Sequence, residues 1–426
     1  MVETTRPEPS RLYRWLVLIF VSLAMFGSYY AYDALSPLAD VLKLQLGFTD
    51  LDIGFLQAIY SFPNIFTVVI GGFLIDRIGL RKSLMLFGVL CFIGPAITAT
   101  SGHLSIMATG RLIFGMGAES LNVAVIAALA RWFKGKELSF AFGLNLTAAR
   151  LGTFAALNSP TWARWAYANW RTPFLISLAF SVFCIIGAAI YWAMEVWAEK
   201  NYSLGAVSTD KVVFADLWKF GTSYWLIVAL CIVFYSAIFP FQTFAVKFFM
   251  EAHGTSREFG GFLSSMLTLF AMIATPLFGL WVDRVGKRAL LMMFGSLLLI
   301  PVYLMMAYTH VSLYVPMAMM GVAFSLIPAV MWPSVAYIVD QSKLGTAYGL
   351  MTMIQNIGLF GLNLLVGWAN EHGHADASNP AGYHLGMWIF STLGILGVVF
   401  SFLLRQREMG PEGHGLETIT TAQRTA

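Results

Sequence analysis

The chain has 426 residues, of which 58% are hydrophobic and only 11% charged, and its formal net charge is +4. A soluble domain is nearer a quarter charged, so this composition excludes an ordinary soluble protein. The apolar residues lie in blocks of about twenty or more, which are long enough to cross a bilayer core of roughly 30 Å. We therefore expect an all-α integral membrane protein in a lipid bilayer.

Twelve apolar spans follow one another along the chain. Six lie near residues 15–37, 51–75, 83–101, 104–129, 139–160 and 171–195. After a polar stretch, six more lie near residues 222–250, 259–281, 288–308, 311–339, 344–370 and 384–405. This pattern predicts five parts: a tail over 1–14, a six-helix bundle over 15–195, a linker over 196–221, a second six-helix bundle over 222–405 and a tail over 406–426.

The basic residues predict the orientation of these spans. With the N-terminus in the cytoplasm, most of the 26 Lys and Arg residues fall on the cytoplasmic side, and the opposite side keeps only Lys43, Arg164, Arg171 and Arg257. Short loops rich in Lys and Arg stay inside. We therefore expect both termini in the cytoplasm, and the net positive charge then reflects topology and requires no nucleic acid partner.

The two halves share one repeated segment. GGFLIDRIGLRKSLMLFG at 71–88 aligns without a gap with FGLWVDRVGKRALLMMFG at 278–295, and each copy joins the second and third span of its half. Two bundles related by such a parallel repeat are typical of the major facilitator architecture.

Each copy of the repeat carries the pattern D-R-x-G-x-R in its loop. Carboxylates there can cap neighbouring helix ends and pair with arginines, which would hold the two halves together on the cytoplasmic side while the outside is open. The alternative is a cluster of positive charge that only sets topology, but such a cluster would not need the aspartate twice. The expected conformational gate consists of Asp76, Arg77, Arg81, Asp283, Arg284 and Arg288.

Two opposite charges are expected at the same depth in the membrane. Glu119 lies about 11 residues before the end of its span and Arg150 about 11 residues after the start of the next, so each is roughly 16 Å deep, near the midplane. Transporters hold substrate at the midplane, and an intramembrane charge is a functional candidate by default. We interpret both residues as facing a central cavity with substrate as their partner. The alternatives are a structural ion pair between them, or Glu119 as a proton-coupling carboxylate.

Other polar residues in the spans are further candidates for the substrate site. Tyr29, Tyr30 and Tyr32 surround Asp33 late in the first span, where they line the outer cavity or form an interfacial belt. Lys247 stands four residues before Glu251, a spacing that is also typical of an ion pair at the rim of a span. Arg111 is expected to be a structural arginine. The second half adds Gln242, Trp332, Gln355 and Asn356 as candidates.

The sequence offers no motif for chemical catalysis. It has no Walker-type phosphate loop and no HExxH, CxxC or GxSxG pattern. The stretch EHGHADASNPAGYH at 371–384 contains metal-binding residue types, but we expect these loop side chains to be solvated. The three cysteines lie inside apolar blocks. We therefore expect a protein that is not an enzyme, with no metal, no cofactor and no disulfide framework.

These features resemble the major facilitator superfamily across residues 12–405. Within it, five stretches are similar to the branch of the animal lysosomal dipeptide transporters: FGSYYAYD (26–33), YSFPNIFTVVIGGFLIDRIG (60–79), GRLIFGMGAESLNVA (110–124), RWFKGKELSFAFGLNLTAARLGT (131–153) and FPFQTFAVKFF (239–249). The resemblance implies a uniporter for dipeptides that holds its substrate with Glu119 and Arg150. It also places Lys247 where this branch has a lysine in its seventh span.

The resemblance also bears on partners and location. The animal proteins carry an acidic dileucine sorting signal near the N-terminus and work with a glycosylated accessory subunit. The stretch MVETTRPEPSRLYRW at 1–15 has no such signal. This favours a monomer without the subunit in a bacterial inner membrane, with a lysosomal membrane as the alternative for a eukaryotic source.

The sequence therefore predicts a secondary transporter of dipeptides, or of similar small zwitterions, that works by alternating access. Within transport, the alternative is a proton-coupled carrier of a small organic anion, with Arg150 for the anion and Glu119 for the proton. An alternative of another class is a non-transporting membrane sensor or scaffold. Its expected mark is a large extra soluble domain, and residues 406–426 are too short and polar for one.

Overall fold

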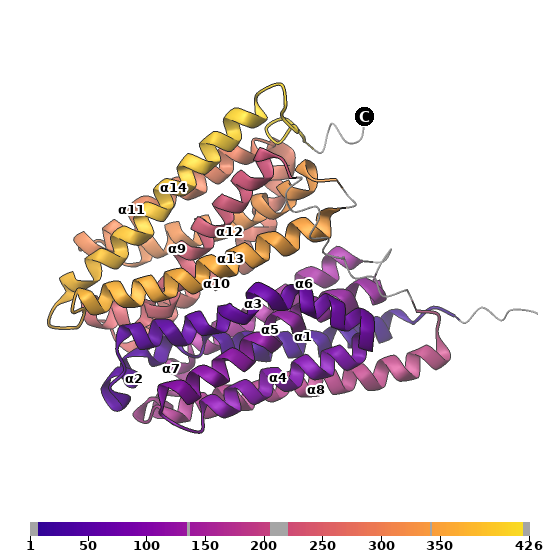
Figure 1. Ribbon diagram of the computed structural model, residues 1–426, viewed down its shortest axis with the longest axis horizontal. Coiled ribbons are helices and arrows are strands. Elements are labelled where there is room, and N and C mark those ends of the chain that lie inside the picture. Colours follow the sequence, from indigo (N-terminus) through magenta and orange to yellow (C-terminus); the bar gives the residue numbers. More distant parts are fainter. Residues whose placement is uncertain (1–6, 134–136, 205–219, 341–342, 421–426) are drawn as a thin grey trace, which may run out of the picture. The chain divides into compact units, whose positions relative to one another are not determined.

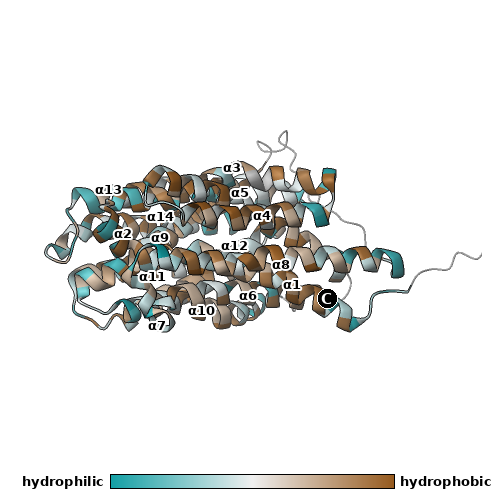
Figure 2. Ribbon diagram, turned by 90° about the horizontal axis from the view of Figure 1, so that it is seen from below, coloured by the Kyte–Doolittle hydropathy of each residue, from teal (hydrophilic) through white to brown (hydrophobic). Residues whose placement is uncertain are grey.

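The structure is a computed structural model that describes residues 7–133, 137–204, 220–340 and 343–420, without the side chains of residues 67–69 and Ser139. Helices make up nearly all of these residues (Figure 1), and the only strand-like pairing among them is an isolated bridge between Asp376 and Asn379. Figure 2 shows hydrophobic residues along the helices and hydrophilic residues at many helix ends and in the loops. The predicted orientation also used Arg6, Lys134, Lys136, Lys211, Lys219 and Arg424, which lie outside the described residues.

Eleven of the described helices are long and apolar enough to cross a membrane, and there are twelve if the bent pair Asp50–Phe66 and Ile70–Ile78 is one span. The prediction of an all-α protein with many spans is therefore confirmed. On α10 (Arg257–Val285) the side chains of Ile273, Leu277 and Leu280 are exposed and recur every three or four residues. Such an apolar stripe is what a helix presents to lipid.

The helices fall into two compact units. Unit 1 comprises Met1–Leu35, Ile59–Ala156 and Trp165–Lys211, and unit 2 comprises Ser36–Ala58, Leu157–Arg164 and Val212–Ala426. The limits of the two bundles expected from the sequence remain predictions.

The described residues of the first half contain eight α-helices and two short 3-10 helices. In chain order they are α1 (Arg11–Asp33), η1 (Ser36–Leu38), α2 (Ala39–Leu46), α3 (Asp50–Ile78), α4 (Leu80–Thr98), α5 (Leu104–Phe133), α6 (Leu138–Leu157), α7 (Ser159–Trp162), η2 (Arg164–Ala168) and α8 (Arg171–Asn201). The second half contains α9 (Thr222–His253), α10, α11 (Arg288–Tyr308), α12 (Tyr314–Ile338), α13 (Leu344–His372), η5 (Pro380–Tyr383) and α14 (His384–Glu408).

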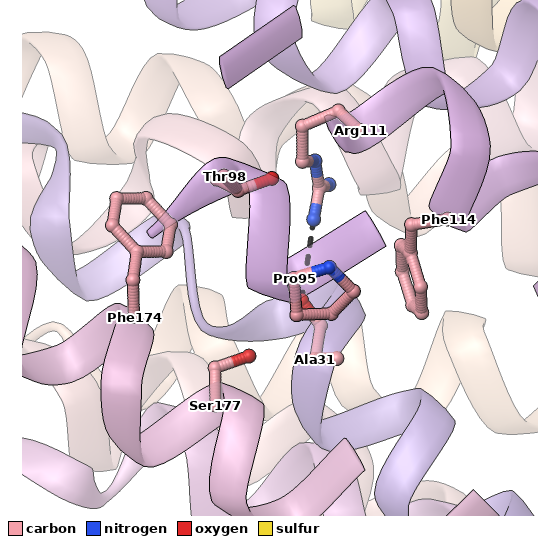
Figure 3. Close-up of a pocket in the computed structure, with 7 residues that line it drawn as sticks. All are labelled: Ala31, Pro95, Thr98, Arg111, Phe114, Phe174 and Ser177. Carbon is pink, nitrogen blue, oxygen red and sulfur yellow. Dashed lines mark hydrogen bonds between the residues drawn. The ribbon is translucent and has the colours of Figure 1, made fainter. Parts of the chain in front are cut away.

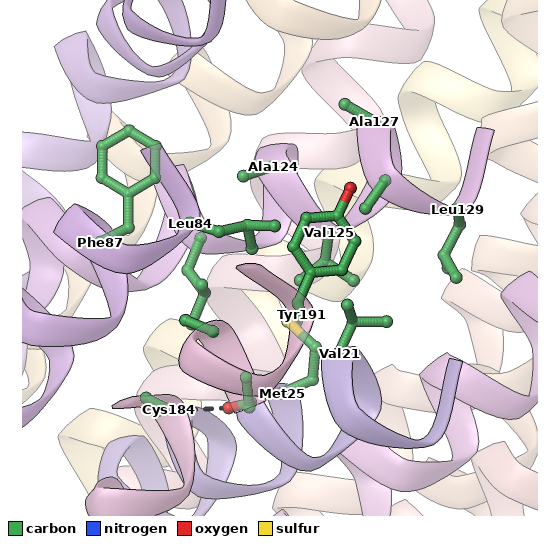
Figure 4. Close-up of a cluster of buried hydrophobic side chains, with 14 of the residues drawn as sticks. Val21, Met25, Leu84, Phe87, Ala124, Val125, Ala127, Leu129, Cys184 and Tyr191 are labelled. Carbon is green, nitrogen blue, oxygen red and sulfur yellow. Dashed lines mark hydrogen bonds between the residues drawn. The ribbon is translucent and has the colours of Figure 1, made fainter. Parts of the chain in front are cut away.

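The core of unit 1 is formed by α1, α4, α5 and α8. Figure 4 shows Met25 of α1, Leu84 of α4, Val125 of α5 and Tyr191 of α8 packed together, all of them buried. Glycines allow these helices to approach closely, as a β-carbon on Gly94 of α4 would lie 2.7 Å from the carbonyl oxygen of Gly110 on α5, which is too close. Small residues at helix contacts are the usual means of packing helices in membranes, where burial in lipid gives little driving force.

In unit 2, α9 is the most enclosed helix. Nearly every residue from Leu230 to Phe249 is buried. The start of α3 packs closely against α13, because a β-carbon on Gly54 would lie 2.4 Å from the carbonyl oxygen of Asn363, and one on Gly367 would lie 2.6 Å from that of Asp50. These contacts fix the first turn of α3 in unit 2.

All three cysteines are buried, and none of them is in a disulfide in this structure.

Candidate substrate site

Glu119 is held in unit 1 by the contact between α5 and α3. A β-carbon on Gly115 would lie 2.2 Å from the carbonyl oxygen of Tyr60, so only glycine allows this approach. Glu119 is one turn further along α5, and the Tyr60 hydroxyl lies 3.5 Å from its Oε1 atom. Glu119 as a whole residue is half-buried.

Arg150 is placed by a similar contact between α6 and α1. A β-carbon on Gly152 would lie 2.3 Å from the carbonyl oxygen of Phe26. Arg150 is also half-buried. Tyr29, one turn along α1 from Phe26, lies within electrostatic range of both Arg150 and Glu119. The structure therefore brings the two predicted charges to one side chain, which supplies a negative and a positive pole in a single unit.

Asp33, which the sequence placed among the tyrosines of the first span, and Thr153, which it did not indicate, belong to the same group. The Asp33 carboxylate interacts with the Thr153 hydroxyl and lies near the guanidinium groups of Arg150 and Arg111. Thr153 follows Arg150 by three residues, so the helical period alone puts both on one face of α6. That spacing was the signal that could have identified it.

Arg111 has a structural role, as expected. Its guanidinium donates to the carbonyl oxygen of Ala31 at 3.2 Å, as Figure 3 shows. It also donates to the carbonyl oxygen of Tyr32 at 3.4 Å, and both acceptors lie in the last turn of α1. It also lies over the rings of Tyr60 at 5.5 Å and Phe114 at 5.7 Å. Carbonyl groups at the end of a helix lack partners within the helix, and this arginine supplies donors to them. The cavity beside it measures about 10 Å³, which is room for at most one water.

The three predicted tyrosines of α1 differ in their surroundings. Tyr29 and Tyr32 are half-buried, and Tyr32 contacts Tyr60 edge-to-face with ring centroids 4.7 Å apart. Tyr30 is buried and stacks on Phe180 of α8 at 4.1 Å. Tyr30 is thus a packing residue between α1 and α8, whereas Tyr29 and Tyr32 belong with the charges.

Lys247 lies in unit 2 and is fully buried. Its Nζ atom is 2.8 Å from Oδ2 of Asp50, 3.1 Å from Oε2 of Glu251 and 2.9 Å from the hydroxyl oxygen of Tyr383. A lysine ammonium has three donors, and these three partners use all of them. The predicted pairing with Glu251 is therefore present, inside a larger buried cluster. The partner Asp50 is 197 residues away in sequence, so no local pattern indicated it.

The other candidates in the second half lie at different levels along α9. Trp332 donates to the Tyr235 hydroxyl at 2.9 Å, and the side-chain oxygen of Gln355 faces the Cys231 thiol at 3.7 Å. Cys231 and Lys247 are about 24 Å apart along a straight helix, so these side chains do not converge on one point. Gln242 and Asn356 are nearly buried, and Asn356 donates to a backbone carbonyl of its own helix.

The two copies of the repeated loop have different ion pairs. In the second copy, Arg288 is paired with Asp283 at 3.2 Å. In the first copy, Arg81 is paired with Glu199 near the end of α8 at 2.6 Å. Arg131 at the end of α5 joins Glu199 at 3.3 Å and also pairs with Glu195. The remaining arginines of the two loops are exposed, Arg77 beside the Phe73 ring and Arg284 in the last turn of α10.

In the loop at 371–384, the acidic residue Asp376 is held by hydrogen bonds from its neighbours in the loop. Asp376 accepts from the Ser378 hydroxyl at 2.6 Å and from the backbone N–H groups of Ser378 and Asn379. These hydrogen bonds hold the pKa of Asp376 below its ordinary value. No group of three or more His, Cys, Asp or Glu within the described ranges could hold a metal ion.

Comparison with known proteins identifies the family. The family model described as Major Facilitator Superfamily matches residues 21–248 and again residues 226–420. The lysosomal dipeptide transporter MFSD1 of Homo sapiens is 33% identical over 422 residues, which is 95% of this chain and 89% of that protein. The same transporter of Danio rerio is 33% identical over 84% of this chain and 80% of that protein. The resemblance to this branch is therefore confirmed.

Solved structures share the fold at low sequence identity. A D-xylose–proton symporter is similar with a TM-score of 0.73 at 16% identity, covering 92% of this chain and 97% of that one. The nucleoside transporter NupG (D323A mutant) has a TM-score of 0.72 at 12% identity, covering 92% of this chain and 99% of that one. Together, the family match, the relatives and the fold show that the chain belongs to the major facilitator superfamily and is a multi-pass membrane transporter, not an enzyme.

Proposed function

We propose that the protein moves dipeptides across the membrane by alternating access, as a uniporter. Glu119 binds the substrate ammonium group and Arg150 binds its carboxylate, with Tyr29 between them. The relatives that match 84 to 95% of the chain are named dipeptide transporters, which supports this substrate class.

The observation that carries the proposal is the presence of two half-buried, oppositely charged side chains around Tyr29. The charged ends of an extended dipeptide are about 7 Å apart, roughly twice the span of a single amino acid. Two poles on helices that are each fixed by a close backbone contact, α5 to α3 and α6 to α1, would select substrates by length as well as by charge.

Thermal unfolding of the purified protein tests this. Free dipeptides in excess should raise the melting temperature because they bind the folded state. N-acetylated and C-amidated dipeptides should each bind at least several-fold more weakly, since blocking either end leaves one pole without a partner, at a cost of about 1–3 kcal/mol.

Charge variants separate the two poles. Glu119→Gln should remove the preference for a free amino terminus and leave the preference for a free carboxylate. Glu258→Gln, which alters an ion pair with the exposed Arg164, is the matched control and should bind like the wild type. Equal binding of free and N-acetylated dipeptides by the wild type would contradict the assignment of Glu119.

A proton-coupled carrier of a small organic anion is the second candidate, and Asp33 favours it. A second carboxylate beside Arg150 provides a proton site other than Glu119. Uptake into liposomes separates the two functions. A uniporter equilibrates its substrate whether or not a proton gradient is imposed, whereas accumulation above equilibrium that is abolished by Asp33→Asn or Glu119→Gln would establish coupling.

The proposal also covers the orientation, the membrane and the oligomeric state of the protein. We place both termini in the cytoplasm, from the distribution of Lys and Arg, and propose a monomer in a bacterial inner membrane that works without an accessory subunit. Glu8→Cys and Glu412→Cys, which lie toward the two ends of the chain, test the orientation by cysteine labelling in right-side-out vesicles. Labelling of either site by an impermeant reagent would place that site outside the cytoplasm and contradict the proposed orientation.

A further inference from the structure

The segment that follows α14 is bound to the second copy of the repeated loop. The backbone N–H of Lys287 donates to the carbonyl oxygen of Glu417 at 3.1 Å, and that of Arg288 donates to Leu416 at 3.1 Å. Leu416 is fully buried, although the segment around it is polar. The contact is therefore built from backbone pairing and from one enclosed apolar side chain.

Glu417 lies at the first turn of α11. Its Oε1 atom accepts from the backbone N–H of Ala289 at 2.8 Å and from that of Leu290 at 3.3 Å. Its Oε2 atom lies 3.6 Å from Nε of Arg405 on α14. The first N–H groups of a helix have no partners within the helix, and a carboxylate at this end is favoured by the helix dipole. Glu417 is thus a cap supplied from more than a hundred residues away.

Glu408, the last residue of α14, is a second anchor for the segment. It is nearly buried and accepts from the Ser223 hydroxyl of α9 at 2.6 Å. It also accepts from the backbone N–H of His414 at 2.8 Å and of Leu416 at 3.4 Å. A buried carboxylate requires partners of this kind. The segment is therefore tied to the ends of α9, α11 and α14.

Arg288 is the residue of the loop that the segment engages. Its guanidinium donates to the carbonyl oxygen of Ile419 at 2.7 Å, to Asp283 at 3.2 Å and to the Tyr337 hydroxyl at 3.3 Å. It also lies over the Tyr337 ring at 4.6 Å and is almost fully buried. The buried charge is stabilised by these contacts, of which the segment supplies the shortest.

The repeat explains why the segment is needed. Arg81 corresponds to Arg288, and in the first copy its partner is Glu199 near the end of α8. The ends of α8 and α14 have the same separation in sequence as the two loops, and at this separation Gln406 stands opposite Glu199. Gln406 is exposed and carries no charge. The second half thus lacks the acidic residue that meets the arginine in the first half.

We propose that the second copy of the repeated loop is a docking site for the chain's own segment Gly413–Thr420, which takes the place that the acidic end of α8 has in the first copy. Glu417 supplies a carboxylate to the first turn of α11, and the carbonyl oxygen of Ile419 supplies an acceptor for Arg288. The docked segment occupies the loop within its own half, so the two copies of the loop have different partners in the protein.

A spin label at Thr418 reports whether the segment is docked. Thr418 is exposed, so the label disturbs little, and Thr418→Cys is labelled in the full chain, where Cys91, Cys184 and Cys231 are all buried. Unlabelled wild type gives the background. In lipid nanodiscs, we expect the spectrum of a label with restricted motion when Thr418→Cys is the only substitution. Adding Glu417→Gln should increase the mobile fraction at least several-fold. Glu412→Gln is the matched control, because Glu412 directly precedes the segment and pairs with the exposed Arg407, and it should leave the spectrum unchanged.

The outcomes of the spin-label experiment can be told apart from those of the dipeptide-binding experiments. Dipeptide binding by Glu417→Gln should equal that of the wild type, since Glu417 lies in unit 2, outside the group around Tyr29. A freely mobile label at Thr418 without any substitution would overturn the docking. An equal increase in mobility in Glu412→Gln and Glu417→Gln would also overturn it, because it would show that total charge, and not the cap on α11, holds the segment.

Discussion

Among single residues, Arg111 and Arg150 of unit 1 differ in how far they are buried. Arg111 is almost fully buried and its donors are used by carbonyl oxygens of α1. Arg150 is half-buried beside Tyr29 and Asp33. The first arrangement stabilises a helix end, whereas the second leaves accessible surface where a substrate carboxylate could bind.

Arg150→Lys should therefore lose most dipeptide binding while it folds normally, because lysine cannot make the planar two-pronged contact with a carboxylate. Arg111→Lys is the matched comparison. It should lower the melting temperature and keep the dipeptide preference of whatever fraction folds. Binding and thermal unfolding of both variants, measured side by side, check this. If Arg150→Lys binds as tightly as the wild type, Arg150 belongs with Arg111 as a structural residue.

The site was predictable from the sequence only in part, and the reason is geometric. Counting residues from a span end gives the depth of a side chain, and this selected Glu119 and Arg150. It does not give the direction in which a side chain points around the helix axis, so Tyr30 was grouped with Tyr29 although it packs against α8. The partnership of Lys247 with Asp50 required the fold, because the two residues are far apart in sequence.

Between helices, the buried cluster around Lys247 joins α9, the start of α3 and the segment that contains Tyr383. The two carboxylates of Asp50 and Glu251 both face one ammonium group. Lys247→Met would remove the cation that both carboxylates share and leave Asp50 with only the more distant Lys43, at 3.9 Å. Removing one partner of a buried ion pair typically costs about 3–5 kcal/mol, whereas replacing both partners costs much less.

We therefore expect Lys247→Met to be strongly destabilised and Lys247→Met combined with Asp50→Asn to recover part of the loss. Thermal unfolding of the single and double variants, analysed as a double-mutant cycle, measures the coupling. A Lys247→Met protein of wild-type stability that fails to bind dipeptides would instead make Lys247 a substrate residue, as its place in the sequence family implies.

The helix contacts that position the site depend on glycine. Gly152→Ala should destabilise unit 1 and weaken substrate binding, because the added β-carbon would lie 2.3 Å from the carbonyl oxygen of Phe26 and α6 would have to move. Overpacking of this kind typically costs about 1–3 kcal/mol. Gly143→Ala on the same helix is the control, since nothing lies within 4 Å of its added β-carbon.

Gly143→Ala should be neutral or slightly stabilising, because alanine is the better helix former. Melting temperatures and dipeptide binding of the two variants test the contrast. Similar behaviour of both would show that α6 shifts freely and that the close approach to α1 does not position Arg150.

For the whole molecule, composition and repeats carried most of the prediction. The apolar blocks indicated the spans because a helix must match the thickness of the bilayer, and the repeated loop predicted a division into halves, which stays a prediction. The sequence did not indicate the role of the segment after α14. Its residues are polar and without periodicity, and its structure depends on a helix end in another part of the fold.

The repeated loops are expected to act as a conformational gate. We propose that Asp76 stabilises the outward-open state, in which case Asp76→Asn should slow transport and raise labelling of cysteines placed in the cytoplasmic cavity, with dipeptide binding intact. Asp283→Asn should act differently, since Asp283 pairs with Arg288 beside the docked segment. Transport and labelling rates of both variants check the difference. Unchanged labelling in Asp76→Asn would refute the role of Asp76.

The docked segment also constrains how the two halves can be rearranged in engineered chains. A circular permutation that starts the protein with its second half would turn residues 409–420 into the connection to the first half. That connection would then have to span the distance between the halves and also keep Glu417 on the first turn of α11. A permuted protein with a long flexible insert after Thr420 should satisfy both, while one that replaces residues 413–420 with the insert should lose the cap. In a protein with two related halves, the polar segment after α14, which looks dispensable, is thus specific to the second copy of the repeated loop.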